Sequence, residues 1–304
     1  MTNCDTLNGI APEHGEETLE DEIYAVVFGS VVAVGLPLNA VSLWILVCRH
    51  RLKSSSSVFM SHLALSDLLL VLSLPARVYF HARGNWTLSD YACLSVTMLF
   101  RNNIRASVCF ITCISLDRLL AVVYPLRSRH LRTTANAWKA CAVTWTAIVI
   151  FNIPESLYHM KKLETSNATG TCFAFRQCSD EFSGYIIAGI IFALLGVNMV
   201  STAMVARTLH SRLSHVAMVK NKISVMMIFA MNLLMFIVFF VPLSIFLLLR
   251  INPYPMICLA SVNCCLDPLL YYFSFDAFWK KKDGSDVEVT LARSHVIQRE
   301  SRTL

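Results

Sequence analysis

The sequence predicts an all-α membrane protein, a bundle of seven transmembrane helices. Of its 304 residues, 56% are hydrophobic and only 15% are charged, whereas a soluble domain is roughly a quarter charged. Seven apolar runs follow one another, each long enough to cross a hydrocarbon core about 30 Å thick as a helix. Basic residues gather in every second loop between the runs, which is the charge pattern of a multi-pass membrane protein.

The chain divides into three parts. The first 22 residues carry seven acidic groups and no Lys or Arg, which predicts a solvated, disordered extracellular tail over 1–22 and no secretory signal. The seven-helix domain is predicted over 23–275, and 276–304 follow it in the cytoplasm. The apolar runs of the domain cover approximately residues 23–48, 57–81, 92–123, 138–158, 183–209, 222–249 and 255–275.

The orientation of the chain follows from its basic loops. Lys and Arg are found after the first, third, fifth and seventh runs, at Arg49, Arg51, Lys53, Arg127, Arg129, Arg132, Arg207, Arg212, Lys220, Lys222, Lys280, Lys281 and Lys282. The positive-inside rule therefore places the N-terminus outside the cell and the C-terminus in the cytoplasm. Two glycosylation sequons, at Asn85 and Asn167, both fall in predicted outside loops and support the same orientation.

Five polar side chains within the apolar runs are costly to place in a membrane and are therefore candidates for function. They are Asn39, Asp67, Ser107, Asn263 and Asp267. Asp67 and Asp267 cannot both be bare anions in a dry bundle, so they need a proton, a cation or a hydrogen-bonded network. Two interpretations stay open, a structural network and an allosteric sodium ion held by these oxygens. No other metal or cofactor is expected, because no ligand spacing for one is present.

The third run ends in the charged pair Asp117-Arg118. Neighbouring residues do not face each other on a helix, but the long Arg118 side chain can reach a second helix. A charged pair with two possible partners suits a two-state switch. The alternative is an anchor at the membrane interface.

Sequence motifs stand in order along the apolar runs. They are Gly35-Leu-Pro-Leu-Asn39, Leu63-Ala-Leu-Ser-Asp67, Asp117-Arg118-Leu119, Trp145, Phe236-Ile-Val-Phe-Phe-Val-Pro242, and Asp267-Pro-Leu-Leu-Tyr271 followed by Phe278. With these motifs the chain resembles the rhodopsin-like (class A) G-protein-coupled receptors over about residues 24–282. Leu74-Pro-Ala-Arg77, Tyr124-Pro125-Leu126 and the sequence around Asn263 are similar to the purinergic cluster, especially its lysophosphatidic-acid receptors.

The resemblance implies a plasma-membrane receptor that passes binding of an outside ligand to a heterotrimeric G protein, with arrestin as a further partner. It implies a disulfide between Cys93 and Cys172 and a short cytoplasmic amphipathic helix, helix eight, within 276–304. The residues it implies for the signalling switch are Asp117, Arg118, Phe236, Phe240, Pro242, Pro268 and Tyr271.

The ligand that the resemblance implies is an anionic lipid, lysophosphatidic acid. Arg77 matches an arginine expected to meet the anionic headgroup, and we expect Phe100, Arg101 and Arg105 to line the same site. Glu155 is the nearest acidic group within a span, and one carboxylate cannot neutralise three guanidiniums, which favours a phosphate-bearing ligand. The alternative for Arg101 and Arg105 is a structural role between helices.

Other functions are also considered. A receptor for a nucleotide or another small anion is less favoured, because Ser244 and Leu247 stand where nucleotide receptors show a histidine and a basic residue. A non-signalling seven-helix protein that modulates another receptor is favoured by the short stretch between Pro242 and Pro268. A light-driven pump needs a lysine in run 255–275, which has none. An enzyme is not expected, because no nucleophile stands with a base. A nucleic-acid partner is not expected either.

Overall fold

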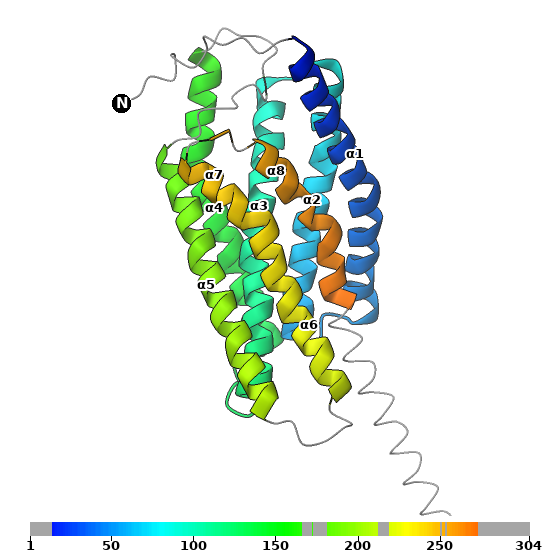
Figure 1. Ribbon diagram of the computed structural model, residues 1–304, viewed down its shortest axis with the longest axis vertical. Helices are drawn as coiled ribbons and strands as arrows, with labels where there is room; N and C mark the ends of the chain where they lie inside the picture. The colour runs from blue at the N-terminus through cyan, green and yellow to red at the C-terminus, as the bar shows by residue number, and fades with distance from the viewer. Residues whose placement is uncertain are drawn as a thin grey trace, which may run out of the picture.

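The computed structural model is a bundle of long helices that run along the long axis of the molecule (Figure 1). It describes residues 14–165, 172, 181–211, 219–249, 251–252 and 254–272. The helices are α1 (His14–Trp44) with a π-helical turn (Ile45–Arg49), α2 (Ser55–Arg83), α3 (Asp90–Val123), α4 (Thr134–Thr165), α5 (Glu181–Ser211), α6 (Val219–Met235) with a π-helical turn (Phe236–Phe240), α7 (Val241–Leu249) and α8 (Tyr254–Ser261). The described residues contain no β-strand.

These elements form the seven predicted helical segments. The sixth segment comprises α6, the π-helical turn Phe236–Phe240 and α7, and the seventh comprises α8 and the helical residues 263–272 beyond Val262. Six stretches are long and apolar enough to cross a membrane, namely Leu19–Arg49, Ser55–Arg83, Asp90–Val123, Thr134–Tyr158, Gly184–Ser211 and Val225–Leu249. The all-α membrane fold predicted from the sequence is therefore confirmed. Helix eight lies outside the described residues.

Apolar side chains cover the outside of the bundle. Leu72 and Val143 are each 69% exposed, and Val26 is 68% exposed. A soluble monomer rarely leaves such large apolar surfaces in water. The outer faces are therefore suited to lipid, and the protein is a multi-pass membrane protein.

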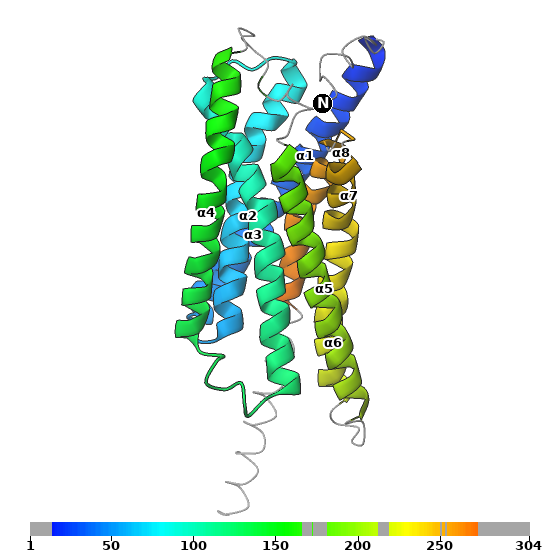
Figure 2. The same cartoon turned by 90° about the vertical axis from the view of Figure 1, so that its left-hand side faces the viewer.

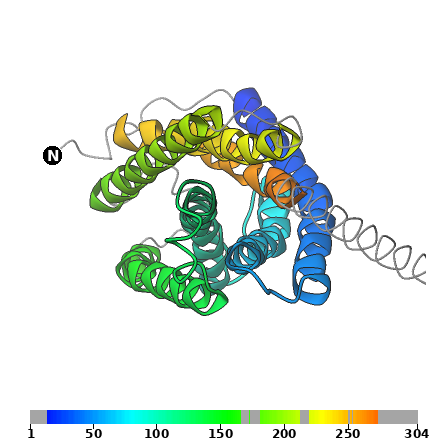
Figure 3. The ribbon, with the colours of Figure 1, turned by 90° about the horizontal axis from the view of Figure 1, so that it is seen from below.

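Helix α3 lies inside the bundle. It packs against α2, α4, α5 and α6, and the end-on view shows it enclosed by other helices (Figure 3). The view at right angles to Figure 1 shows α3 running beside α2 and α4 over most of its length (Figure 2). Candidate residues on α3 can therefore contact side chains on several other helices.

Helix α1 begins earlier than the sequence predicted. It starts at His14, whereas the predicted acidic tail extended to residue 22. Acidic side chains near a helix N-terminus interact favourably with the helix dipole, and Glu is a good helix former. Asp21 also has a partner on α2, described below, so tertiary contact supports the extension. Residues 1–13 lie outside the described part of the chain.

The sixth segment carries a π-helical turn just before its proline. The turn spans Phe236–Phe240, and Pro242 is the second residue of α7. Proline lacks a backbone N–H, and its ring clashes with the carbonyl four residues earlier, here that of Val238. The wider turn relieves this clash, and such turns are frequent at functional positions.

The junction between α7 and α8 is short, as the sequence predicted. Helix α7 ends at Leu249 and α8 begins at Tyr254. The side chain of Asn252 accepts a hydrogen bond from the Tyr254 N–H at 3.1 Å and so caps the new helix. The short junction places Tyr254 at the end of the bundle where α2 ends.

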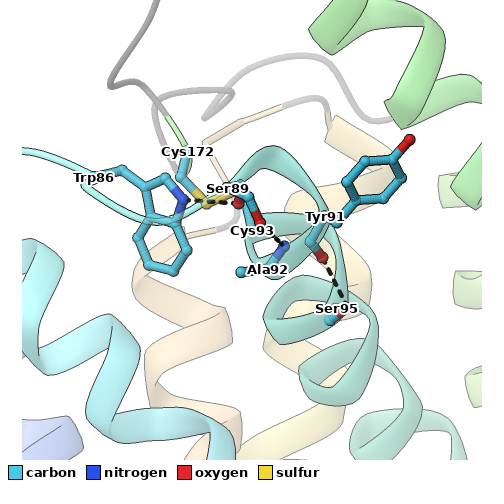
Figure 4. Close-up of a disulfide and its surroundings, with 7 residues drawn as sticks. All are labelled: Trp86, Ser89, Tyr91, Ala92, Cys93, Ser95 and Cys172. Atoms are coloured by element: carbon cyan, nitrogen blue, oxygen red, sulfur yellow. Dashed lines mark hydrogen bonds between the residues drawn. A yellow bond between two sulfur atoms is a disulfide. The ribbon is translucent and has the colours of Figure 1, made fainter.

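A disulfide joins Cys93 and Cys172, as the resemblance implied (Figure 4). Cys93 lies in the first turn of α3, which Ser89 caps by accepting a hydrogen bond from the Ala92 N–H. Trp86 packs on the disulfide and donates its indole N–H to the Ser89 carbonyl oxygen at 3.2 Å. Asn85, one of the two sequons, is exposed beside this cluster, whereas Asn167 lies outside the described residues.

Candidate functional site

Arg77 is buried near the C-terminal end of α2, with 4% of its surface exposed. Its guanidinium carbon lies 4.4 Å from the ring centroid of Phe100 on α3, a cation–π geometry. The Tyr254 side chain, at the start of α8, hydrogen-bonds to the same guanidinium. Three helices therefore hold the cation in one orientation. Of the residues expected to line the ligand site with Arg77, Phe100 lies against it.

His81 lies one helical turn beyond Arg77 and connects three helices. Its Nδ1 lies 2.8 Å from an oxygen of Asp21 on α1, and its Nε2 hydrogen-bonds to the Tyr254 hydroxyl. The ring stacks on Phe28, which also contacts the edge of Phe100. Sequence reasoning missed this histidine. The signal was its spacing, because residues four apart share a helix face and Arg77 was already a candidate.

Arg101 and Arg105 lie at a different place from Arg77. Both form ion pairs with Glu155 of α4, whose side chain is 5% exposed. Arg105 also donates to the Asn152 side-chain oxygen at 2.5 Å. The three arginines therefore divide between two sites, and the α3–α4 pairing favours the structural interpretation for these two. Two guanidiniums facing one carboxylate leave a net positive charge there.

A cavity of about 280 Å³ lies between α3, α4 and α5. Its lining is apolar, with Ile104, Phe151 and Ile187 among the wall residues, except for Arg105 and Thr144. Two wall residues, Val143 and Ile190, are also 69% and 40% exposed on the outside of the bundle. The cavity thus opens on the surface that faces lipid.

The predicted polar network in the middle of the bundle is centred on two buried carboxyl groups. Asp67 and Asp267 lie close to one another, and both are fully buried. Asn103 donates to Asp67 at 2.9 Å, and Asn263 donates to Asp267 at 2.8 Å. Asn103 is a member of the network that the sequence interpretation did not include.

Two predicted members take other positions. Asn39 donates to the backbone oxygens of Gly35 and Cys264, so it ties α1 to the seventh segment. The close approach depends on Gly35, where a Cβ would lie 3.2 Å from the Cys264 sulfur. Ser107 is fully buried, and its hydroxyl has no hydrogen-bond partner among the described residues.

Asp117, near the C-terminal end of α3, has hydrogen-bond partners on α2 and in the loop after α3. The hydroxyls of Ser55 and Ser56, in the first turn of α2, donate to its two oxygens. Arg132, in the loop after α3, donates to the same oxygens at 3.1 and 3.3 Å. Arg132 and Asp117 therefore form a bidentate ion pair, which fixes the orientation of both side chains. The charged partner of Asp117 is therefore Arg132.

The chain matches the 7 transmembrane receptor (rhodopsin family) over residues 38–271. This match covers more than half of the chain and includes all seven helical segments in part. The chain belongs to the rhodopsin family of seven-transmembrane receptors. Membership confirms the resemblance on which the expected disulfide and switch residues rested.

Several receptors similar to this chain are named after a lipid ligand. Lysophosphatidic acid receptor 4 of Homo sapiens is 33% identical over 287 residues, 86% of this chain and 76% of that receptor. Lysophosphatidic acid receptor 5 of Bos taurus is 34% identical over 84% of this chain and 77% of the relative. The uracil nucleotide/cysteinyl leukotriene receptor of Homo sapiens is 31% identical over 88% and 78%.

All seven residues expected to form the signalling switch of a rhodopsin-family receptor lie within the described helices. Phe236 and Phe240 are buried, with ring centroids 5.6 Å apart in an edge-to-face arrangement. Tyr271 is buried, and its hydroxyl has no hydrogen-bond partner in the described part of the chain. Pro268 follows Asp267 directly in the seventh segment. Arg118 is half-buried beside Asp117.

Proposed function

We propose that this protein is a plasma-membrane receptor that binds an anionic lipid, lysophosphatidic acid, and activates heterotrimeric G proteins. The observation that carries the proposal is Arg77, a guanidinium buried among aromatic side chains at the outer end of the bundle. A planar guanidinium recognises a phosphate through paired hydrogen bonds, and low polarity around it strengthens the attraction. The relatives named as lysophosphatidic acid receptors support the same ligand class.

The α3–α4–α5 cavity, which lies beside Arg105 and not beside Arg77, also favours a lipid over a nucleotide as the class of ligand. An acyl chain needs an apolar space, and this cavity has apolar walls and an opening toward the bilayer. A nucleotide needs polar partners for its base and ribose. Ser244, at a position where nucleotide receptors show a histidine, is buried and donates to the Phe240 carbonyl oxygen of its own helix.

The orientation proposed is N-terminus outside. The disulfide and the exposed sequon Asn85 lie at one end of the bundle, and disulfides and N-glycans form on the extracellular side. The basic residues Arg49, Arg51 and Lys53 lie at the other end, as expected for the cytoplasmic face. That face would receive the G protein and arrestin.

A G-protein activation assay tests the proposal in cells without endogenous lipid receptors. Lysophosphatidic acid should give a saturable response, whereas the monoacylglycerol of the same chain length, which lacks the phosphate, should give none. A nucleotide panel is run on the same cells. A protein that reaches the surface and answers only nucleotides, or nothing, would overturn the lipid proposal and favour one of the alternatives.

We further propose that sodium binds between Asp67 and Asp267 as an allosteric ion. Buried oxygens of Asp67, Ser107, Asn263 and Asp267 have no hydrogen-bond partner among the described residues, and oxygen ligands suit this ion. The competing interpretation is one proton shared by the two carboxyl groups. With bound sodium, both carboxylates can remain charged.

Sodium dependence of stability separates these interpretations. The melting temperature of the purified receptor should rise with sodium chloride relative to choline chloride at equal ionic strength. Asp67→Asn should abolish the difference, because it removes one carboxylate ligand. Asp90→Asn, an exposed carboxylate at the start of α3, is the matched control and should keep it. A wild-type receptor indifferent to sodium would support the shared proton.

Loss of the Arg132–Asp117 contact should raise basal signalling. Arg132→Ala removes both hydrogen bonds that hold the loop after α3 to Asp117. The conformation in which Asp117 is paired with this loop is therefore destabilised. We expect basal G-protein activation to rise about fivefold, which corresponds to about 1 kcal/mol. Arg129→Ala, an exposed arginine of the same loop, should leave it unchanged. Equal basal activity in both variants would show that the Arg132–Asp117 contact does not hold the receptor inactive.

A further inference from the structure

The outer site contains a carboxylate beside its hydrogen-bond donors. The Tyr254 hydroxyl bonds to both the His81 imidazole and the Arg77 guanidinium, so the three groups form one continuous cluster. On the far side of His81, the Asp21 carboxylate lies 2.8 Å from Nδ1. The contacts among Asp21, His81, Tyr254 and Arg77 thus join α1, α2 and α8.

Asp21 is the member of this cluster nearest to solvent. Its side chain is 28% exposed, whereas that of His81 is 1% exposed and Arg77 is buried. An anion that enters from outside therefore meets Asp21 before it meets the donors. Guanidinium, phenol and imidazole groups are all used to bind phosphate oxygens, and Asp21 supplies oxygens of the same charge sign at that place.

The geometry of the junction between α7 and α8 explains why the donors converge. Tyr254 is the first residue of α8, and the Asn252 cap and the edge of the Tyr24 ring hold it in place. The short junction leaves little chain above this point. The extended first helix reaches the same place and brings Asp21 against His81.

We propose that Asp21 is an internal counter-anion of the ligand site, and that a phosphate group displaces it from His81. In this proposal His81 and Tyr254 bind the phosphate together with Arg77. The inference rests on the proposed function for the identity of the lipid. It goes beyond that function in naming two ligand-binding residues and a built-in competitor.

Inorganic phosphate is the probe for the first experiment. The melting temperature of the purified full chain is measured against phosphate concentration, with chloride added to keep the ionic strength equal. Asp21→Asn should lower the half-saturating phosphate concentration roughly tenfold, because a charge-assisted hydrogen bond no longer competes. Glu22→Gln is the matched control, since Glu22 is an exposed carboxylate on the same helix, and it should match the wild type.

A double variant makes the test specific to the proposed competition. His81→Gln should weaken phosphate binding, and Asp21→Asn should then give no gain, because the contact that it relieves is absent. Two results would overturn the proposal. One is that Asp21→Asn binds phosphate no more tightly than Glu22→Gln. The other is that its full gain persists in the His81→Gln background, which would indicate only a change in surface potential.

The same variants are then titrated with lysophosphatidic acid in cells. Asp21→Asn should respond at roughly tenfold lower concentration than the wild type and Glu22→Gln. If the phosphate results hold but no variant responds to the lipid, the anion site is supported and the proposed lipid is wrong. If the lipid activates the wild type and Asp21→Asn leaves both its potency and phosphate binding unchanged, the internal counter-anion is wrong and the proposed function stands.

Discussion

Arg77→Ala should shift the response to lysophosphatidic acid to concentrations at least about 30-fold higher. Removal of one partner from a buried, hydrogen-bonded charge pair costs about 2–5 kcal/mol, and 2 kcal/mol corresponds to about 30-fold. The ligand phosphate would lose its guanidinium, and Phe100 would lose its cation–π contact. The measurement is the half-maximal concentration for G-protein activation, at matched surface expression.

Two variants sharpen the Arg77 result. Arg77→Lys keeps the charge but loses the planar group that lies over Phe100, so its response should fall between those of wild type and alanine. Arg83→Ala removes an exposed arginine near the end of the same helix and should leave the response unchanged. Normal potency in Arg77→Ala at normal surface level would refute the assignment of the headgroup to this residue.

Glu155→Ala should remove most of the receptor from the cell surface. The substitution leaves Arg101 and Arg105 without the carboxylate that pairs with both of them, and breaking a buried ion pair costs about 3–5 kcal/mol. That is a large part of the stability of a typical domain. Surface expression and the melting temperature of the solubilised receptor are the measurements.

Removal of the unpaired charges should rescue this loss. The triple variant Arg101→Gln, Arg105→Gln and Glu155→Gln contains no charge at the site and keeps amide groups that can hydrogen-bond between α3 and α4. It should recover much of the surface expression, because neutral pairs avoid the cost of an uncompensated charge. If Glu155→Ala alone expresses and melts like the wild type, the three side chains do not stabilise the bundle.

Some candidate residues could be predicted from their own apolar run, whereas their partners on other helices could not. The carboxyl pair of Asp67 and Asp267 was predicted because a polar group in an apolar run is conspicuous whatever surrounds it. The sequence indicates Glu155 for the same reason. That Glu155 pairs with Arg101 and Arg105, and not with Arg77, depends on which faces of α3 and α4 meet. Periodicity within one helix gives no information about this.

The partners of Asp117 and His81 illustrate the same limit. Ser55, Ser56 and Arg132 lie far from Asp117 in the sequence or across a loop, and their residue types are common at membrane interfaces. Asp21 lay in a stretch whose acidic composition is typical of a solvated tail. In the folded bundle this stretch is helical, and Asp21 contacts the buried imidazole of His81.

The sequence by itself determined the membrane fold, the order of the spans, their expected orientation and the family. Each of these follows from hydropathy, charge and motifs that are local properties of the chain, and a span stays a span whichever neighbours it has. Only the tertiary structure decided which polar groups meet. It separated Arg77 from the Glu155 site, joined Tyr254 and Asp21 to His81, and paired Asp117 with Arg132. Such pairings depend on the rotation and closeness of neighbouring helices, which are set by packing over the whole bundle.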